Sequence, residues 1–244
     1  LDRLARVIAR QFKIAGIRTA DIKLDAHAAG GKLEFSPLSA TLYEGMVSGN
    51  LSASAGNPQR FAGKLSLRNI RVGPLLKDAM DKDPLDGKGD VALDVVSTGA
   101  SVSQLKKALN GTASLSLKDG AVKGFNIAGA LRKAKSSGAG DEKTDFTELT
   151  GSFKISNGVA HNDDLLAKTP LLRLGGAGDI NIGDSTLDYT AKATVVPTLE
   201  GQGGPELQGL KGLTIPVRLS GPFTNVAWKI EMGNVAGNRA KELT

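Results

Sequence analysis

The chain has 244 residues and a net charge of +6, and it is 40% hydrophobic but only 4% aromatic. It contains no cysteine, which excludes disulfides, thiolate chemistry and zinc–thiolate sites. The basic charge favours nucleic acid, anionic lipid or acidic polysaccharide as a partner, but nucleic acid is disfavoured because stacking platforms need aromatic residues. No apolar run is long enough to cross a bilayer.

Residues 1–16 are predicted to form an amphipathic helix that caps the end of a sheet. Leu4, Ile8 and Phe12 recur at helical spacing, and basic residues fall on a second stripe. Such a helix can also lie on an anionic membrane, but both stripes are short and strands follow directly. The chain begins at Leu1, so we expect a fragment whose targeting segment lies upstream.

Residues 17–72 alternate between apolar and polar positions, which predicts an antiparallel meander with one apolar and one wet face. Gly30-Gly31 and Glu44-Gly45 are turn signals in this segment. A helix opened by Pro74 is predicted next, followed by a strand and a short helix over 101–108.

Residues 109–135 form the clearest local unit. A strand over 112–118 is followed by Asp119-Gly120, a dipeptide typical of a two-residue hairpin turn. A second short strand and a short helix are predicted after it, with Asn126 as the helix cap and basic residues at its end. The unit is therefore strand, turn, strand and helix.

An apolar-x-Gly triplet recurs at strand entries. The triplets that start at Phe61, Leu85 and Leu109 are 24 residues apart, and those at Leu149 and Leu174 are 25 apart. Periods of this length indicate an elongated architecture built of quasi-repeats.

The C-terminal part is predicted to continue the sheet through a hairpin at Asn157-Gly158. Residues 136–145 and 201–206 are expected to be loops, and residues 234–244 a tail. The whole chain, 1–244, is interpreted as one domain. Its fold class is mainly β, an elongated, curved antiparallel sheet with about fourteen strands and a few short capping or crossover helices.

No catalytic or metal motif stands out. Residues 81–87 resemble a calcium loop only superficially, because the acidic spacing is wrong and Ala92 stands where the closing Glu should be. His161 has two carboxylates beside it but no further imidazole nearby in sequence. Residues 175–178 are glycine-rich but continue a strand, so they do not fit a dinucleotide fingerprint. We expect no cofactor, no metal and no enzymatic activity.

The sequence resembles the C-terminal region of the AsmA family of bacterial envelope proteins. The resemblance rests on FSPLSATLYEGMVSGNLSASAG, on the succession from LDGKGDVALDV to LNGTASLSLKDGAVKGFNI, and on FTELTGSFKISNGVAHNDDLLAKTPLLRLGGAGDINI. It implies a periplasmic protein, anchored in the bacterial inner membrane when full-length. It also implies a long β-groove like that of bridge-type lipid transfer proteins, serving phospholipid transport to the outer membrane and the integrity of that membrane.

Bulky apolar side chains are scarce for so extensive a sheet, so a thick filled core is hard to build. A concave face left open to acyl chains would solve this shortage. The candidate groove liners are the larger apolar residues of the predicted central strands: Leu93, Val95, Leu115, Leu117, Leu172, Leu174, Ile180, Tyr189 and Val195.

The expected partner is phospholipid or another anionic lipid, whose head groups the basic excess would serve. A second hypothesis is a structural or assembly module that binds outer-membrane proteins or their assembly machinery through open sheet edges. A carbohydrate-active enzyme is a third hypothesis, which would need a cleft with paired carboxylates. Asp163 and Asp164 are adjacent, so they would point apart on a strand.

Overall fold

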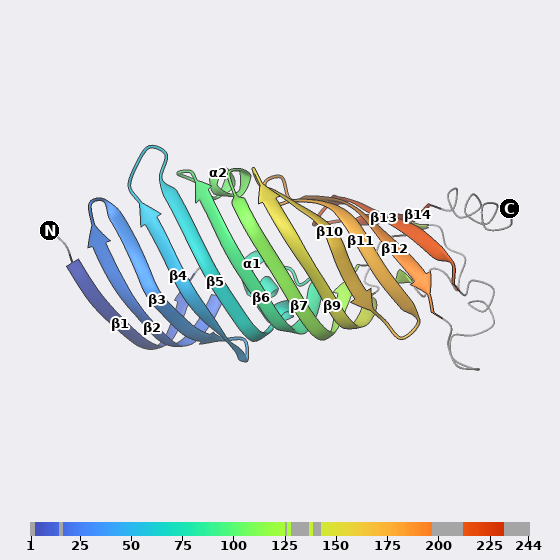
Figure 1. Ribbon diagram of the computed structural model, residues 1–244, viewed down its shortest axis with the longest axis horizontal. Coiled ribbons are helices and arrows are strands. Elements are labelled where there is room, and N and C mark those ends of the chain that lie inside the picture. The colour runs from blue at the N-terminus through green and yellow to red at the C-terminus, as the bar shows by residue number, and fades with distance from the viewer. Residues whose placement is uncertain are drawn as a thin grey trace.

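The fold is a single open antiparallel sheet of fourteen strands with two short helices (Figure 1). A computed structural model describes residues 3–14, 17–124, 126–127, 137–138, 143–196 and 212–231, with the backbone alone for 3–14, 80 and 137–138. The mainly β, elongated and antiparallel fold predicted from the sequence is confirmed.

The strands follow one another across the sheet almost in chain order. The first seven are β1 (Arg3–Ile14), β2 (Ile17–Ala29), β3 (Lys32–Leu42), β4 (Gly45–Ser54), β5 (Arg60–Arg71), β6 (Leu85–Thr98) and β7 (Asn110–Lys123). After them come β9 (Lys143–Ser156), β10 (Val159–Lys168), β11 (Leu172–Asn181), β12 (Thr186–Val195), β13 (Thr214–Pro222) and β14 (Ala227–Ile230). The two-residue strand β8 (Ser137–Gly138) pairs with β14 at the far edge.

Two of the predicted hairpins are confirmed. Gly30 and Gly31 join β2 to β3 with φ of 53° and 75°, and Asn157 and Gly158 join β9 to β10 with φ of 48° and 78°. Positive φ at both central residues gives the turn whose twist matches that of the flanking strands. Glycine and asparagine adopt this conformation at little cost, which is why both turns could be predicted from the sequence.

The predicted helix over residues 1–16 is wrong, because residues 3–14 form strand β1 and pair with β2. Leu4, Ile8 and Phe12 are four residues apart, and a spacing of four fits both a helix face and a strand face. A short isolated helix is marginal in water, whereas the β2 edge offers a complete ladder of backbone hydrogen bonds. Pairing with the edge of β2 therefore selected the strand instead of the helix.

The predicted hairpin at Asp119-Gly120 is also wrong. Strand β7 continues through both residues. Between the pairs Lys88–Lys118 and Asp86–Ala121, Asp119, with φ of 47°, and Gly120 stand opposite one residue of β6, Gly87. This is a β-bulge, which uses the same positive φ as a tight turn but leaves the strand direction unchanged.

The predicted segments at the C-terminal side are only partly described. Residues 137–138 and 143–145 of the expected 136–145 loop lie in β8 and β9, so these parts are strand. The helix expected after Asn126, apart from residues 126–127, the 201–206 loop and the 234–244 tail lie outside the described residues.

The predicted repeat corresponds to strand-plus-connection units. Strands β5, β6 and β7 begin at Arg60, Leu85 and Asn110, each 25 residues after the one before. Helix α1 (Val72–Met80) follows β5, and helix α2 (Val102–Lys107) follows β6. As predicted, α1 contains Pro74 in its first turn.

One face of the sheet carries the apolar core residues of the strands whose side chains are described, and we call it the inner face. Directly paired residues of antiparallel strands point to the same side, so the register defines apolar rows that cross the strands. Three such rows are Leu33, Ala53 and Phe61; Leu93, Ala113 and Phe153; and Leu174, Ala193 and Ile215.

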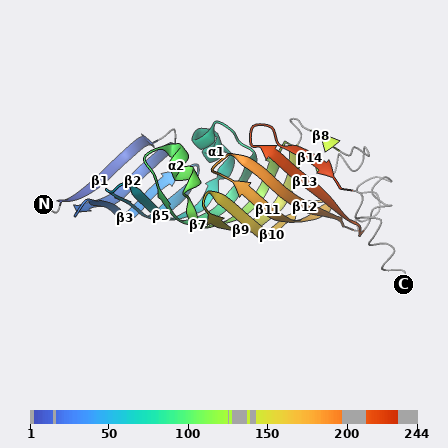
Figure 2. The same ribbon diagram turned by 90° about the horizontal axis from the view of Figure 1, so that it is seen from above.

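The two helices lie at opposite ends of the strands (Figures 1 and 2). We call the α1 end the lower end and the α2 end the upper end. Val72 of α1 is buried in the core of the inner face, and Leu75 and Leu76 pack against that core. The Asp78 carboxylate of α1 accepts hydrogen bonds from Tyr43 Oη (2.8 Å) and Arg18 Nε (3.1 Å). These contacts fix α1 over the lower end of the inner face.

Candidate functional site: an apolar face open at one end

The inner face is filled by its own side chains over most of the sheet. Leu117, Leu172 and Val217 are 1%, 0% and 1% exposed, and they belong to one cluster that runs from β3 to β14. Ile127, which follows β7, is 3% exposed and belongs to the same cluster, so a residue outside the strands helps to bury this face. Lys82 Nζ donates to the Thr224 carbonyl at 3.4 Å, which places the connection after α1 beside the β13–β14 turn.

The upper end of β2–β5 is different, because its apolar side chains are uncovered. Leu33, Leu51 and Phe61 are 37%, 37% and 36% exposed. A hollow of about 530 Å³ lies here, lined by residues 28–33 of the β2–β3 hairpin, residues 53–55, Gln59 and Phe61. We call it the upper hollow. It is a shallow hollow, largely open to solvent.

The α2 connection borders the strands of the upper hollow. The Gly99 amide donates to the Gln59 carbonyl (2.9 Å), and the Ser97 hydroxyl donates to the Leu105 carbonyl (2.6 Å). Ser97 pairs with Phe61 in the register, so it lies on the inner face. The buried Ser97 hydroxyl is thus satisfied by the α2 backbone, which ties the helix to the upper end of β6.

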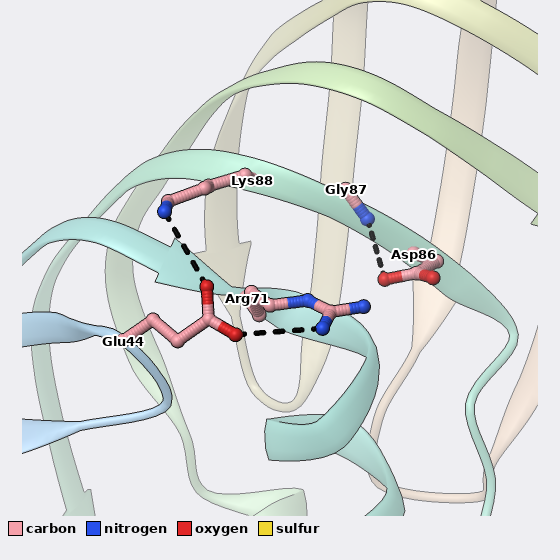
Figure 3. Close-up of polar contacts among 5 residues, drawn as sticks. All are labelled: Glu44, Arg71, Asp86, Gly87 and Lys88. Atoms are coloured by element: carbon pink, nitrogen blue, oxygen red, sulfur yellow. Dashed lines mark hydrogen bonds and ion pairs between the residues drawn. The ribbon is translucent and has the colours of Figure 1, made fainter.

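At the lower end, the strands are joined by polar contacts beside α1 (Figure 3). Glu44, in the β3–β4 turn, contacts Arg71 Nη1 and Lys88 Nζ, each at 3.4 Å. The Asp86 carboxylate accepts from the Gly87 amide at 2.8 Å. A Cβ on Gly73 of α1 would stand 2.7 Å from Asp86 Oδ1, so glycine permits the close approach of the helix. These ion pairs are exposed and add little stability. The lower end of the inner face is therefore covered mainly by the packing of α1.

A polar network interrupts the inner face at β10 and β12. The Tyr189 hydroxyl donates to Asn162 Oδ1, and Asn162 Nδ2 donates to the Ser152 carbonyl (2.7 Å) and to Asp164 (2.6 Å). Burial, with the charges of Asp164 and Asp163, raises the pKa of Tyr189. Hydrogen bonds from the Ser152 hydroxyl and amide lower the pKa of Asp164. The buried Asn162 and Tyr189 thus satisfy each other, and Asp164 holds the irregular part of β10.

The Tyr189 ring packs on two glycines of β11. A Cβ on Gly176 would be 2.5 Å from Tyr189 Cε1, and one on Gly178 would be 2.9 Å from Cδ2. The glycine-rich run 175–178 thus leaves room for an aromatic ring of the neighbouring strand. The sequence had suggested that these glycines allow a backbone or an acyl chain to approach.

The register places all nine candidate groove liners on the inner face. Four of them are half-buried: Leu93, Val95, Leu115 and Ile180. The other five are buried within the core cluster: Leu117, Leu172, Leu174, Tyr189 and Val195. The buried five offer a ligand little surface in this arrangement, and the contact of any of the nine with lipid stays a prediction.

The uncovered residues Leu33 and Phe61 were not among the candidates. Both stand in the alternating pattern of 17–72, so the signal for the inner face was present. Which part of that face is covered depends on where α1 packs and where the sheet curls. The alternation pattern of a single strand predicts neither of these.

The outer face carries charges that are largely paired across strands. Examples are Lys64–Asp94 (3.1 Å) and Arg218–Asp188 (3.0 Å). At the upper hollow, Lys32 is paired with Glu34. The basic excess is therefore not gathered in the lining of this hollow, although the sequence had suggested head groups as its purpose.

Among the described residues, no cluster of three or more His, Cys, Asp or Glu side chains could hold a metal ion. His161 pairs with Asp179 at 2.7 Å, and Asp83 of the calcium-like segment pairs with Lys123. None of the described helices has both the length and the hydropathy needed to span a membrane.

Comparison with known proteins identifies relatives by sequence. The model of the AsmA family matches residues 4–165. The chain is 25% identical over 227 residues to Protein AsmA of Escherichia coli (strain K12), covering 89% of this chain and 36% of that protein. It thus spans little more than a third of that relative. No solved structure matches the chain. The family match covers more than half of the residues, and the chain therefore belongs to the AsmA family, as its sequence pattern had indicated.

Proposed function

We propose that this chain is part of a non-enzymatic envelope protein that holds phospholipid acyl chains against the inner face. In this role it supports lipid transport to the outer membrane and the integrity of that membrane. Membership of the AsmA family suggests an envelope-associated role. We further propose a periplasmic location, with an anchor in the bacterial inner membrane in the full-length protein.

One observation carries the proposal. Apolar rows recur on the inner face from β3 to β13, and at β3–β5 they reach solvent as Leu33, Leu51 and Phe61. Burial of apolar surface contributes about 25 cal/mol per Å², so a hydrocarbon chain laid on this surface gains free energy on contact. The hollow is lined by two of these residues, Leu33 and Phe61, and is open to solvent.

The non-enzymatic part of the proposal is supported by how the polar groups of the inner face are used. Tyr189 and Asn162 bond to each other, and Ser97 bonds to the α2 backbone. These described polar groups of the inner face thus serve the packing of the protein itself.

The test is native mass spectrometry of the purified 244-residue chain with its co-purified lipids. We expect a phospholipid adduct on the wild-type chain. Phe61→Asp and Leu93→Asp should reduce it, because a carboxylate is costly to place against hydrocarbon. Leu117 and Leu174 are less suitable positions, since a charge at such buried sites would unfold the sheet.

Each variant has a neighbour on the other face as its control. Ala62→Asp and Ala92→Asp place the same charge one residue away, where the strand alternation points it outward. Circular dichroism confirms that each variant is folded. An adduct that survives both inner-face changes as well as it survives the outer-face changes would contradict lipid binding at this face.

The unpaired edge of the sheet supports a second candidate function. Among the described strands, β1 pairs with β2 and has no partner on its other side. An unpaired edge can accept a strand from another protein, which supports the hypothesis of an assembly module for outer-membrane proteins. A chain that purifies without lipid but crosslinks to such a protein through β1 would favour this function.

A further inference from the structure

A row of charged side chains crosses six strands on the outer face of the sheet, from β5 to β11. The strand register places its members directly beside one another in the order Arg71, Lys88, Lys118, Glu148, Lys168 and Arg173. Their sequence neighbours Ile70, Leu117 and Leu172 are 0%, 1% and 0% exposed on the inner face, so the row itself points outward. We call these six residues the basic row.

The basic row places like charges side by side. Like charges directly opposite each other on neighbouring strands destabilise a sheet, yet three of the five cross-strand contacts in this row join two cations. Isolated like-charge pairs occur elsewhere, as at Lys123–Lys143, but there each lysine is paired with an aspartate. A local rule that is broken repeatedly in one place is a sign of function.

Two carboxylates lie in or beside the basic row, and they are too few to neutralise it. Glu148 pairs with Lys168. Glu44, in the β3–β4 turn, is shared between Arg71 and Lys88 and lies 3.4 Å from each (Figure 3). Five cations against two carboxylates leave a net charge of +3 on this strip of the outer face.

The excess charge is concentrated on Lys118 and Arg173. Both side chains are exposed, and neither forms an ion pair within the part of the chain that the structure describes. Arg173 Nη1 donates to the carbonyls of Thr169 (2.8 Å) and Leu172 (3.1 Å), which holds the guanidinium in place but leaves its charge unmatched. An anion from another molecule would relieve the repulsion along the row.

The extent of the row indicates the shape of that anion. Neighbouring strands lie about 4.8 Å apart, so the row is roughly 24 Å long, too long for one small anion to neutralise. The sheet twists along its length (Figure 2). At about 20–25° between adjacent strands, the row turns by roughly 100° from β5 to β11. A flat membrane can therefore meet only part of it, whereas a flexible linear polyanion can follow it.

The surroundings of the row select the kind of polyanion. None of its residues is aromatic, so the bases of a nucleic acid would find no stacking platform. The backbones of these strands are bonded to their neighbours on both sides, so an acidic peptide could not add as a strand here. Ser116 and Thr150, two residues along from Lys118 and Glu148, face each other and are exposed. Their hydroxyls suit a partner that is itself rich in hydroxyl groups.

We infer that the basic row binds a linear acidic polysaccharide laid across β5–β11 on the outer face. Its acidic groups lie between neighbouring cations, where charge-assisted hydrogen bonds replace like-charge repulsion. Its sugar hydroxyls meet Ser116 and Thr150. The site lies on the opposite side of the sheet from the surface proposed for lipid, so it neither requires nor excludes that function.

The test uses fluorescein-labelled polygalacturonate, a linear chain of acidic sugars, and follows its fluorescence anisotropy with the purified 244-residue chain. The double variant Lys118→Ala, Arg173→Ala removes the two unpaired cations of the row. Its matched control, Lys64→Ala, Lys154→Ala, removes the same charge from exposed positions of the outer face outside the row. We expect the row variant to bind roughly tenfold more weakly, because charge-assisted hydrogen bonds are lost, and the control variant to bind like the wild type.

Stability and a second ligand complete the test. Urea unfolding should find the row variant at least as stable as the wild type, since a like-charge contact has been removed at both positions. A row variant clearly less stable than the control variant would mean that these cations serve the fold, which overturns the inference. It is also overturned if the wild type does not bind polygalacturonate, or if both double variants lose affinity equally. Loss of binding to phosphatidylglycerol vesicles, with polygalacturonate binding unchanged, would assign the row to a membrane surface instead.

Discussion

At the scale of single residues, the contact between Tyr189 and the glycines of β11 explains why a glycine-rich run stands inside a strand. Glycine in a strand loses packing and costs conformational entropy, so it needs a compensating contact. Here the Tyr189 ring occupies the space that a side chain at Gly176 would take, and its hydroxyl reaches the buried Asn162.

The adjacent glycines Gly175 and Gly176 give a matched pair for this contact. In Gly176→Ala, the new Cβ would stand 2.5 Å from Tyr189 Cε1, so the ring must move, and we expect a loss of about 1–3 kcal/mol in the free energy of unfolding. In Gly175→Ala, the nearest atom is Leu165 O at 3.8 Å, so stability should be unchanged or slightly raised. Urea unfolding followed by circular dichroism measures both, and equal effects would rule out the packing role.

The sequence predicted residues well where conformation is local and poorly where a partner decides. Gly30-Gly31 and Asn157-Gly158 were recognised as turns because positive φ is a property of these residues themselves. The burial of Leu172 and Leu174, proposed as groove liners, could not be read in the same way. Alternation gives the face on which a residue lies, but not what covers that face.

At the scale of elements, helix α1 is the part that closes the lower end of the inner face. Its polar anchor is Asp78, which accepts hydrogen bonds from Tyr43 of the β3–β4 turn and Arg18 of β2. Its apolar anchor is Val72 with Leu75 and Leu76. A nine-residue helix has little stability of its own, so these tertiary contacts maintain it.

Removal of the polar anchor should loosen α1 without unfolding the sheet. In Asp78→Ala, loss of the part-buried bond with Tyr43 should lower the local opening free energy by about 1 kcal/mol, roughly fivefold in amide exchange rate. Hydrogen exchange with mass spectrometry would detect the change in residues 72–80, with β10–β12 unaffected. Asp94→Ala is the control, since its carboxylate pairs with Lys64 on the outer face. Unchanged exchange in α1 would show that Val72, Leu75 and Leu76 hold the helix alone.

The element errors share one cause, which is that a local signal was compatible with two structures. The four-residue spacing of Leu4, Ile8 and Phe12 fits a helix as well as a strand, and pairing with β2 selected the strand. Positive φ at Asp119 fits a turn as well as a bulge, and the long partners β6 and β9 selected the bulge. In both cases the neighbouring strand supplied the missing information.

At the scale of the whole molecule, burial is distributed unevenly along the sheet. The described N-terminal strands β2–β4 contribute few buried apolar residues, namely Ile22, Ala40 and Leu42. Strands β12 and β13 contribute many more, including Ala193, Val195, Ile215 and Val217. Regions with few buried contacts open at lower cost than packed regions.

We therefore expect a gradient of backbone protection. Amides of β2–β4 should exchange faster than those of β10–β13, because opening the N-terminal strands exposes less apolar surface. Hydrogen exchange of the wild-type chain measures this, and a bound phospholipid should slow exchange at the upper ends of β2–β5. Uniform protection along the sheet would mean that the strands open as one cooperative unit.

The fold class was readable from the sequence because it depends on period-two alternation repeated over the whole chain. Prediction of the groove also drew on the small number of bulky apolar residues. The packed C-terminal half shows one way in which that shortage is met, since the glycines of β11 leave room for the Tyr189 ring of the neighbouring strand. Composition alone does not say where such a contact forms.

The near-identity of strand order and chain order has a consequence for how the molecule is made and how it varies. Apart from β8, each described strand is bonded to its neighbours in the chain, so each strand, once the one before it has formed, finds its template already in place. Such nearest-neighbour architectures can grow from one terminus, with no long-range closure to wait for. Whole hairpins can then be gained or lost during evolution without disturbing the rest, which makes length the most adaptable property of this design.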